Sequence, residues 1–380
     1  MEQLTTRPTA VPGQGAAGTE SSGFPGVVPG SLPLAPEARE FFKYLLDLRL
    51  LSPLAVATLL EKSWEKLGEL ENPDALGNAL VDAGLLTRYQ YDRLQTGNTH
   101  GLVLGSYRVL DRLGVGAMGV VYLAEHSLMK RRAAVKVLPV NGDYPADLLE
   151  RFYGEIRVLA DLHHPNIVTA YDAGEVPAAG PRMPPLVYLV MEYISGGDLE
   201  RYVRRHGPAT IGQACEWIRQ AASGLQEAHD RHVIHRDIKP SNLLLNARGQ
   251  IKVVDFGLVR HLSSRLTNPR ALLGTVEFMP PEQSCDPSQV GAQADIYGLG
   301  ASLLWLLTGE PPHPPAPTVA AALKALQHNP PRRLRELRPG APEALDALVD
   351  QMLDPEPANR PATPADVMQA ILPFAERGEA

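Results

Sequence analysis

Cysteine is nearly absent from this chain of 380 residues, which contains only Cys215 and Cys285. Two isolated cysteines provide neither a disulfide framework nor a zinc ligand set, so a reducing cytoplasm is the simplest expected location. An excess of basic residues is also missing, because 36 Lys and Arg are outnumbered by 43 Asp and Glu, a formal net charge of −7. Nucleic acid is therefore not an expected partner.

Long apolar runs are absent as well. The longest run, residues 296–309 (IYGLGASLLWLLTG), is shorter than the roughly 20 residues that a membrane-spanning helix requires, and it predicts a buried helix. The opening residues, MEQLTTRPTA, lack the basic and apolar regions of a signal peptide. These features predict a cytoplasmic protein without a membrane span.

Two segments precede the strand-rich part of the sequence. Residues 1–36 are dense in Pro, Gly, Ser, Thr and Ala, and they predict a disordered tail, because they cannot bury enough apolar surface to offset the entropy of ordering. Residues 37–100 show apolar residues at helical spacing and a capping box at Thr87 and Gln90. They predict a small α-helical bundle without catalytic residues, which favours docking, self-association or the binding of a regulatory partner.

The pattern changes at about Tyr107. Val-rich, alternating segments at 107–114, 119–126 and 131–140 predict strands, whereas helical patterns dominate after residue 194. A strand-rich lobe followed by a larger helical lobe predicts an α+β protein with a cleft between two packed units.

A glycine-rich segment, LGVGAMGVV at 113–121, contains Gly114, Gly116 and Gly119. Strand-like sequence lies on both sides of it, which disfavours a dinucleotide-binding fold, and the chain has no G-K-[ST] for a Walker A loop. Two interpretations remain open from these residues. The segment is either a β-hairpin whose backbone N–H groups approach a polyphosphate, or a plain glycine-rich turn.

Lys136 lies in an apolar, strand-like segment, AAVKVL, where a lysine requires a charged partner. Phosphate oxygens or a carboxylate would both satisfy it. The helix predicted at 146–162 offers Glu150 and Glu155, and Glu155 is preferred because apolar residues follow it on the same helix. The alternative is a surface lysine at the edge of a strand.

The segment VIHRDIKPSNLLL, residues 233–245, places several polar residues between apolar ones. Asp237 is suited to accept a proton from an attacking hydroxyl, and Lys239 is suited to neutralise a phosphoryl group. Asn242 offers a carbonyl oxygen to a hard cation, and Asp255, in IKVVDFGLV, offers a carboxylate. Such ligands suit Mg²⁺, which keeps water and phosphate oxygens as its other ligands.

These motifs resemble those of the protein kinase family, in which a glycine-rich loop, AAVK, HRDIKPSN, DFG and PPE follow one another in this order. The resemblance covers residues 107–372 and implies a two-lobed fold, with an N-lobe at 107–194, a C-lobe at 195–372 and ATP in the cleft. DIKPSN is similar to the same stretch of Ser/Thr kinases, and MPPEQ with DIYGLG is similar to bacterial kinases of the eukaryotic-like type. The resemblance thus implies a serine/threonine protein kinase that acts on protein substrates with ATP and Mg²⁺, or with Mn²⁺ in its place.

The resemblance also implies a role for each matching residue. Asp237 is the catalytic base, and Lys239 supports the γ-phosphate. Lys136 binds the α- and β-phosphates and pairs with Glu155. The implied metal ligands are Asn242 and Asp255, and the implied ATP-binding positions are Leu113, Gly114, Gly116, Gly119, Val121, Ala134, Lys136, Met191, Glu192, Ile194 and Leu244.

Two further matches concern the C-lobe. Asp295, in ADIYGLG, matches the helix that holds the catalytic loop, and Arg360 is the expected ion-pair partner of Glu282. The family's Ala-Pro-Glu is replaced here by Pro-Pro-Glu, in which the extra proline, Pro280, is tolerated in a loop.

Arg236, in the HRD motif, implies control by phosphorylation, because a buried guanidinium favours an anion. The segment between DFG and PPE contains three candidate sites for autophosphorylation, Ser263, Ser264 and Thr267, whereas Thr275 is assigned a structural role. The alternative is a segment that is always ordered, with Arg236 bound by Glu or by backbone carbonyl groups.

Two other functions remain compatible with parts of the pattern. One is a catalytically weak or inactive ATP-binding scaffold, and the other is a small-molecule phosphotransferase on a related fold. The intact set of Lys136, Asp237, Asn242 and Asp255 favours catalysis over a scaffold. The segment that ends in PPE favours a protein substrate over a small molecule.

Overall fold

The computed structural model describes residues 36–52, 54–56, 73–116, 119–140, 146–180, 183–256, 276–285 and 290–375. Contacts divide the chain into two compact units, with the boundary between Leu85 and Leu86. The segment predicted as a disordered tail lies outside the described residues, except for Pro36.

The first unit contains two described helices that pack against each other, α1 (Pro36–Asp47) and α3 (Pro73–Asp82). Their fully buried side chains include Phe42, Leu45, Leu76 and Leu80. Asp74 lies in the first turn of α3, where a carboxylate interacts favourably with the helix dipole. Most of the segment between the two helices lies outside the described residues, so the bundle as a whole stays a prediction.

The second unit starts with α4 (Arg88–Gln95), which begins at the predicted capping box: the Thr87 and Gln90 side chains each accept a hydrogen bond from the other's backbone N–H. The sequence pattern grouped α4 with the preceding helices, whereas the contacts place it in the second unit, where it packs on β2. Helical periodicity identifies an amphipathic helix but does not say which surface its apolar face covers.

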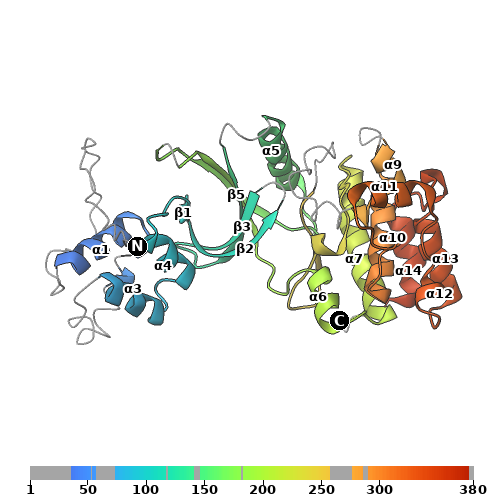
Figure 1. The fold of residues 1–380 in the computed structure, drawn as a ribbon, viewed down its shortest axis with the longest axis horizontal. Helices are drawn as coiled ribbons and strands as arrows, with labels where there is room; N and C mark the ends of the chain where they lie inside the picture. The colour runs from blue at the N-terminus through green and yellow to red at the C-terminus, as the bar shows by residue number, and fades with distance from the viewer. Residues whose placement is uncertain are drawn as a thin grey trace, which may run out of the picture. The chain divides into compact units, whose positions relative to one another are not determined.

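The N-lobe is built on one antiparallel sheet of six strands in the order β1-β2-β3-β4-β6-β5 (Figure 1). One long helix, α5 (Ala146–Asp161), connects β4 to β5. The strands are β1 (Val103–Leu104), β2 (Tyr107–Gly116), β3 (Gly119–His126), β4 (Arg132–Pro139), β5 (Ala170–Val176) and β6 (Leu186–Glu192).

The C-lobe is mainly helical, and one small antiparallel sheet, β7 (Leu243–Leu245) with β8 (Ile251–Val253), follows the catalytic segment. The helices are α6 (Leu199–His206), α7 (Ile211–Asp230), α9 (Pro281–Cys285), α10 (Gln293–Thr308), α11 (Val319–His328), α12 (Leu334–Leu337), α13 (Glu343–Met352) and α14 (Pro364–Ile371), with 3₁₀ turns at Pro240–Asn242, Pro357–Asn359 and Leu372–Phe374.

The longest apolar run of the sequence forms α10, in which nearly every residue is buried, as predicted. A helix that is apolar all round must lie inside the protein, and α10 packs against both α7 and α13. No helix among the described residues is long and apolar enough to cross a membrane. The predicted α+β lobes, one rich in strands and one helical, are confirmed.

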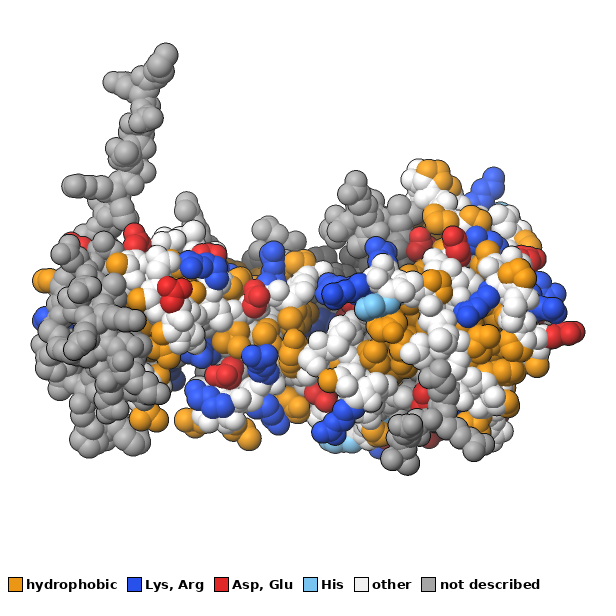
Figure 2. Space-filling model, turned by 90° about the horizontal axis from the view of Figure 1, so that it is seen from below, with side chains coloured by type: hydrophobic (Ala, Val, Ile, Leu, Met, Phe, Trp, Pro, Cys, Tyr) orange, Lys and Arg blue, Asp and Glu red, His pale blue; other side chains and the backbone are white. Residues whose placement is uncertain are grey.

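On the face shown in Figure 2, the Lys and Arg side chains of the described residues are scattered among acidic and apolar ones. They form no continuous basic surface on this face.

Candidate active site

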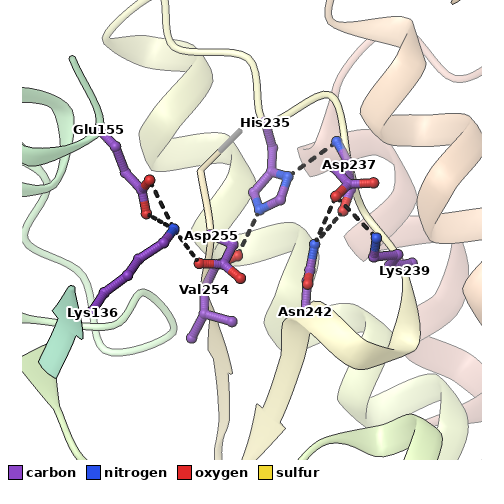
Figure 3. A network of polar contacts seen from close by, with 8 residues as sticks. All are labelled: Lys136, Glu155, His235, Asp237, Lys239, Asn242, Val254 and Asp255. Carbon is purple, nitrogen blue, oxygen red and sulfur yellow. Dashed lines mark hydrogen bonds and ion pairs between the residues drawn. The ribbon is translucent and has the colours of Figure 1, made fainter. Parts of the chain in front are cut away.

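A buried lysine joins both lobes of the second unit. Lys136 lies on β4, and its Nζ is 2.7 Å and 2.9 Å from the two carboxylate oxygens of Glu155 (Figure 3). The same Nζ is 2.9 Å from Asp255 Oδ1, just beyond β8. Lys136 is 6% exposed and Glu155 is 2% exposed, so this lysine is not at a surface edge.

Helical spacing explains how Glu155 reaches the lysine. Phe152 and Leu159 lie one turn before and after it on α5, and both are fully buried in the core that also contains Phe256. The carboxylate therefore sits on the packed face of α5, and Lys136 compensates for the cost of its burial. The other candidate, Glu150, is exposed.

The charges of this cluster influence one another. Burial alone would lower the pKa of Lys136, but Asp255 and Glu155 together raise it above its ordinary value. Lys136 in turn holds the pKa of Asp255 below its usual range, against the effect of burial. Burial raises the pKa of Glu155, and Lys136 opposes that effect. The Asp255 side chain is the exposed member of the cluster, at 48%.

The register of the sheet gathers the implied ATP-binding positions on one face. Val121 on β3 pairs with Lys136 on β4, and Ala134 on β4 pairs with Met191 on β6. Residues that pair directly, and residues two apart on one strand, point to the same side. Gly114 pairs with Val121 and continues this face into the glycine-rich segment.

The three glycines of that segment differ in whether the fold leaves room for a side chain at their positions. Gly119 has φ +138°, and a Cβ there would lie 2.2 Å from the backbone oxygen of Val137, so the fold itself demands glycine. A Cβ at Gly114 would meet nothing within 4 Å, and one at Gly116 would meet only Gly119 O at 3.8 Å. Among the described residues, the fold therefore leaves room for a side chain at both positions and does not itself demand glycine there. The tip of the hairpin, residues 117 and 118, lies outside the described residues.

The remaining implied ATP-binding positions lie at or after the end of β6, on β7 and on β2. The backbone N–H of Glu192, the last residue of β6, donates to Thr169 O at 2.9 Å. Ile194 is buried two residues later, and Leu244 on β7 is half-buried. Leu113, on β2, is 36% exposed.

The candidate catalytic segment places Asn242 at the end of a short 3₁₀ turn, Pro240–Asn242, with Asp237 and Lys239 just before it. Asn242 Nδ2 donates to the backbone oxygen of Asp237 at 2.8 Å and to its Oδ2 at 3.3 Å (Figure 3). Lys239 Nζ lies 3.1 Å from the same Oδ2. The two hydrogen bonds of Asn242 use its amide nitrogen, so its carbonyl oxygen keeps the direction suited to a cation.

A fully buried carboxylate, that of Asp295, binds the backbone of this segment. Asp295, in the first turn of α10, accepts hydrogen bonds from the backbone N–H groups of His235 (2.9 Å) and Arg236 (2.7 Å). Its Oδ2 also lies 2.8 Å from His229 Nε2 on α7. Arg236 adopts φ +66°, a strained conformation for a non-glycine residue, and these hydrogen bonds stabilise it.

His235 is a residue to which sequence reasoning gave no role. Its Nε2 lies 2.9 Å from Val254 O and its Nδ1 3.2 Å from the backbone N of Asp237, so it links the two segments that carry the candidate base and the candidate metal ligand. Its ring also packs on Phe256, with centroids 4.8 Å apart. The signal was present in the sequence, since a histidine that directly follows Val233 and Ile234 predicts burial with bonded nitrogens.

Lys252 was missed in the same way. It is 7% exposed, and its Nζ lies 2.7 Å from a carboxylate oxygen of Glu192 at the end of β6. The rule that identified Lys136, a lysine inside an apolar strand, applies equally to Lys252 in IKVV.

The expected pair of Arg360 and Glu282 is confirmed. The guanidinium forms two hydrogen bonds to the carboxylate, at 2.7 Å and 2.9 Å, and donates to the backbone oxygens of Gln293, Asp354 and Pro355. Arg360 thereby fixes the start of α9 to the start of α10.

The segment that carries the candidate phosphorylation sites lies outside the described residues, including Ser263, Ser264, Thr267 and Thr275. On its C-terminal side, a small, partly open hollow lies beside Asp237 and is lined also by Ile238, Phe278 and Gln283. Arg236 lines this hollow too, and its Nη2 donates to Val290 O at 3.4 Å.

The donor set fits a magnesium ion bound together with phosphates. No group of three or more His, Cys, Asp or Glu side chains in the described residues is arranged to hold a metal. A carboxylate from Asp255 and an amide oxygen from Asn242 do suit Mg²⁺, which takes its remaining ligands from water and phosphate.

Comparison with known proteins agrees with this geometry. Residues 107–371 match the protein kinase domain. The chain is 35% identical to the serine/threonine-protein kinase PrkC of Bacillus subtilis over 266 residues, 70% of this chain and 40% of PrkC. It is 37% identical to the serine/threonine-protein kinase PknB of Mycobacterium leprae over 271 residues, 70% of this chain and 42% of that protein. The match thus covers well under half the length of these relatives. The chain belongs to the protein kinase family, with a catalytic domain of the bacterial, eukaryotic-like Ser/Thr type.

Proposed function

We propose that this protein transfers the γ-phosphate of ATP to serine and threonine hydroxyls of proteins. The observation that carries the proposal is the convergence of two polar clusters in one site. Lys136, Glu155 and Asp255 form one cluster, and Asp237 with Asn242 forms the other. His235 connects them by hydrogen bonds to Val254 and Asp237.

The chemistry assigns a task to each side chain. Asp237 accepts the proton of the attacking hydroxyl, and the nearby Lys239 ammonium stabilises negative charge on the phosphoryl group. Lys136 binds phosphate oxygens while Glu155 holds it in position. Asn242 and Asp255 would hold Mg²⁺, or Mn²⁺ in its place, and the ion would neutralise charge on the phosphates.

Nucleotide recognition follows from the sheet face described above. The half-buried side chains of Val121, Ala134 and Leu244 offer apolar contacts to a purine ring, and Met191 is buried beside them. Gly114 and Gly116 leave space for phosphates. The protein is proposed to act in the cytoplasm, where ATP is available and where the free Cys215 and Cys285 stay reduced.

The test is transfer of radiolabelled γ-phosphate to a generic basic protein and to the chain itself, with Asp237→Asn as the matched variant. Loss of a general base lowers the rate by about a hundredfold to ten-thousandfold, so labelling should nearly vanish in the variant. ATP binding, measured by equilibrium dialysis, should persist in both proteins. ATP binding without transfer by the wild type would contradict the proposal and indicate a scaffold, and transfer to sugars but not to proteins would indicate a small-molecule phosphotransferase.

We infer that autophosphorylation controls the activity, at Ser263, Ser264 or Thr267. Arg236 supports this inference, because its guanidinium lines the hollow beside Asp237 and a phosphate would form charge-assisted hydrogen bonds with it. Mass spectrometry after incubation with ATP and Mg²⁺ should find the modification in this segment. An unmodified segment in an enzyme that labels other proteins would contradict the inference.

The N-terminal helices are proposed to bind a regulatory partner or a second copy of the chain. Deletion of residues 1–85 respects the contact boundary and keeps α4 with the second unit. The expected result is a change in oligomeric state or in partner binding, measured by light scattering and affinity capture. An unchanged mass and an unchanged set of bound proteins would count against this role.

A further inference from the structure

The Thr87 and Gln90 side chains, at the N-terminal end of α4, form hydrogen bonds both within the helix cap and to the sheet. Gln90 Oε1 accepts from the backbone N of Thr87 at 2.9 Å, and Thr87 Oγ1 accepts from the backbone N of Gln90 at 3.2 Å. Each of the two side chains also donates a hydrogen bond to a backbone oxygen of β2. Gln90 Nε2 donates to Val109 O at 2.6 Å, and the Thr87 hydroxyl donates to Leu110 O.

The two acceptors on β2 lie where that strand departs from regular pairing. Val109 pairs with Ala124 on β3, but the next paired residue is Asp111, which leaves Leu110 as an extra residue. Such a bulge disrupts the ladder locally and bends the strand. The capping side chains of α4 bind the carbonyl groups of Val109 and Leu110 at this bend.

Packing supports the same contact. Gln90 is fully buried, and a buried side-chain amide is costly unless it is hydrogen-bonded. Tyr89, also on α4, lies against Tyr122 of β3, with ring centroids 6.2 Å apart. The helix therefore contacts both strands of the hairpin that carries the glycine-rich turn.

The helix that makes this contact, α4, lies outside the match to the protein kinase domain, which begins at residue 107. The preceding strand β1 belongs to the same sheet, and Val109 N donates to Leu102 O at 2.9 Å. Residues 86–106 are thus part of the folded N-lobe and not a connection to it.

We propose that Gln90, together with Thr87, is a positioning residue for ATP: it fixes the bend of β2 and thereby holds Gly114 and Gly116 over the nucleotide phosphates. The proposal rests on the proposed kinase function. The bulge at Leu110 and the irregular pairing between Arg112 and Gly114 lie on the same strand, directly before the glycine-rich turn. The strand pairs with β3 at eight of its ten residues, and only Leu110 and Leu113 lack a paired residue. Each irregularity bends the strand locally, so a contact that fixes the first bend affects where the end of the strand lies.

The test is Gln90→Glu, with Asp92→Asn on the exposed face of the same helix as the matched control. Glutamate at this position still caps α4, because a carboxylate oxygen accepts from Thr87 N, but it cannot donate to Val109 O when ionised. The KM for ATP should rise about fivefold, the effect of one buried hydrogen bond, while kcat stays within about twofold. The dissociation constant of ATP, measured by equilibrium dialysis in the Asp237→Asn background, should rise by the same factor.

The pH dependence of the KM for ATP distinguishes the loss of this one hydrogen bond from a general loss of stability. A buried carboxyl has a raised pKa and donates a hydrogen bond while it is protonated, so the defect of Gln90→Glu should shrink toward pH 6 and grow toward pH 9. Asp92→Asn should show the wild-type KM throughout. Thr87→Ser, which keeps the hydroxyl, should behave like the wild type, and Thr87→Val should raise the KM for ATP.

A variant that lowers the stability of the C-lobe shows how a loss of stability alone affects the kinetics. Leu348→Ala, in the core of the C-lobe, lowers the free energy of unfolding without touching β2. Partial unfolding reduces the amount of active enzyme and hence the apparent kcat, but leaves KM unchanged. A wild-type KM and dissociation constant for ATP in Gln90→Glu would overturn the positioning role, whereas a wild type that transfers no phosphate would overturn the kinase function itself.

Discussion

The two lobes hold their parts of the site in different ways. In the C-lobe, Asp295 is fully buried and binds the catalytic segment through backbone N–H groups, inside a core of packed helices. In the N-lobe, Lys136 is positioned by two carboxylates, and the glycine-rich turn lies at the end of an irregular strand. Backbone hydrogen bonds to a buried carboxylate therefore fix the candidate catalytic segment of the C-lobe, whereas ion pairs position Lys136 in the N-lobe.

This difference has a physical basis. Hydrogen bonds from backbone N–H groups to a buried carboxylate leave the loop little freedom, because breaking one exposes an unsatisfied buried group. An ion pair is less directional and responds to any charge that enters the cleft. Under the proposed function, a nucleotide with its metal would bring such charge, and Lys136 would exchange Asp255 for phosphate while Glu155 stays its partner.

The largest effect is expected from Asp295→Asn, which tests the C-lobe side. The amide keeps one acceptor oxygen but turns an NH₂ group toward N–H donors, so we expect about 4 kcal/mol less stability to urea unfolding. The catalytic segment should also move, with a loss of kcat of about a hundredfold. Urea melts and steady-state kinetics with varied ATP measure both quantities.

If Asp295→Asn changed the KM for ATP as much as it changed kcat, the C-lobe would also determine nucleotide binding. The proposed difference between the two lobes would then not hold. The matched control is Asp350→Asn on α13, an acid-to-amide change at a half-exposed position. It should leave both the unfolding free energy and kcat nearly unchanged.

A smaller effect is expected from Lys136→Met, which tests the N-lobe side. Loss of the ammonium leaves Glu155 buried without its partner, so we expect a cost of about 3 kcal/mol in unfolding free energy. Phosphate transfer should fall about a hundredfold because an electrostatic contact to phosphate is lost. Urea melts and kinetics at saturating ATP measure the two losses.

The double variant Lys136→Met with Glu155→Leu separates stability from function. Apolar residues of similar volume replace a buried ion pair without loss of stability or with a gain, so the urea midpoint should recover. Activity should stay low, since no cation remains for phosphate. Recovery of activity along with stability would show that the N-lobe pair is only structural.

Sequence reasoning found the segments that meet in the candidate site, because their residue types and spacing are local features of the sequence. Lys136 and Glu155 were paired correctly from burial cost and helical spacing. Long-range partners were harder to predict: the contact of Lys252 with Glu192 depends on how β8 and β6 meet, which no local pattern contains. The packing of α4 on β2 was missed for the same reason, since Gln90 gave a capping signal but no sign of its second partner.

The smallest effect concerns the pH dependence of the C-lobe core. Cys215 on α7 is fully buried, and burial raises the pKa of its thiol to about 12. In the unfolded chain a thiol titrates near about 8.5, so above that pH the unfolded state loses a proton that the folded state retains. The stability contributed by the neutral thiol is thus complete below about pH 8.5 and falls by about 1.4 kcal/mol per pH unit above it. Urea melts from pH 7 to 10 should show this slope in the wild type but not in Cys215→Ala.

The rate at which the Cys215 thiol reacts measures the opening of the C-lobe alone. Exposed Cys285 should react with a maleimide at once, whereas Cys215 should react only when the C-lobe opens. In a Cys285→Ser background, Asp295→Asn should speed the labelling of Cys215, because it weakens the helical core directly. Lys136→Met should leave that rate near the wild-type value if the N-lobe site opens on its own. Equal acceleration by both variants would mean that the two lobes unfold as one unit, and that the difference between them concerns only how they bind nucleotide.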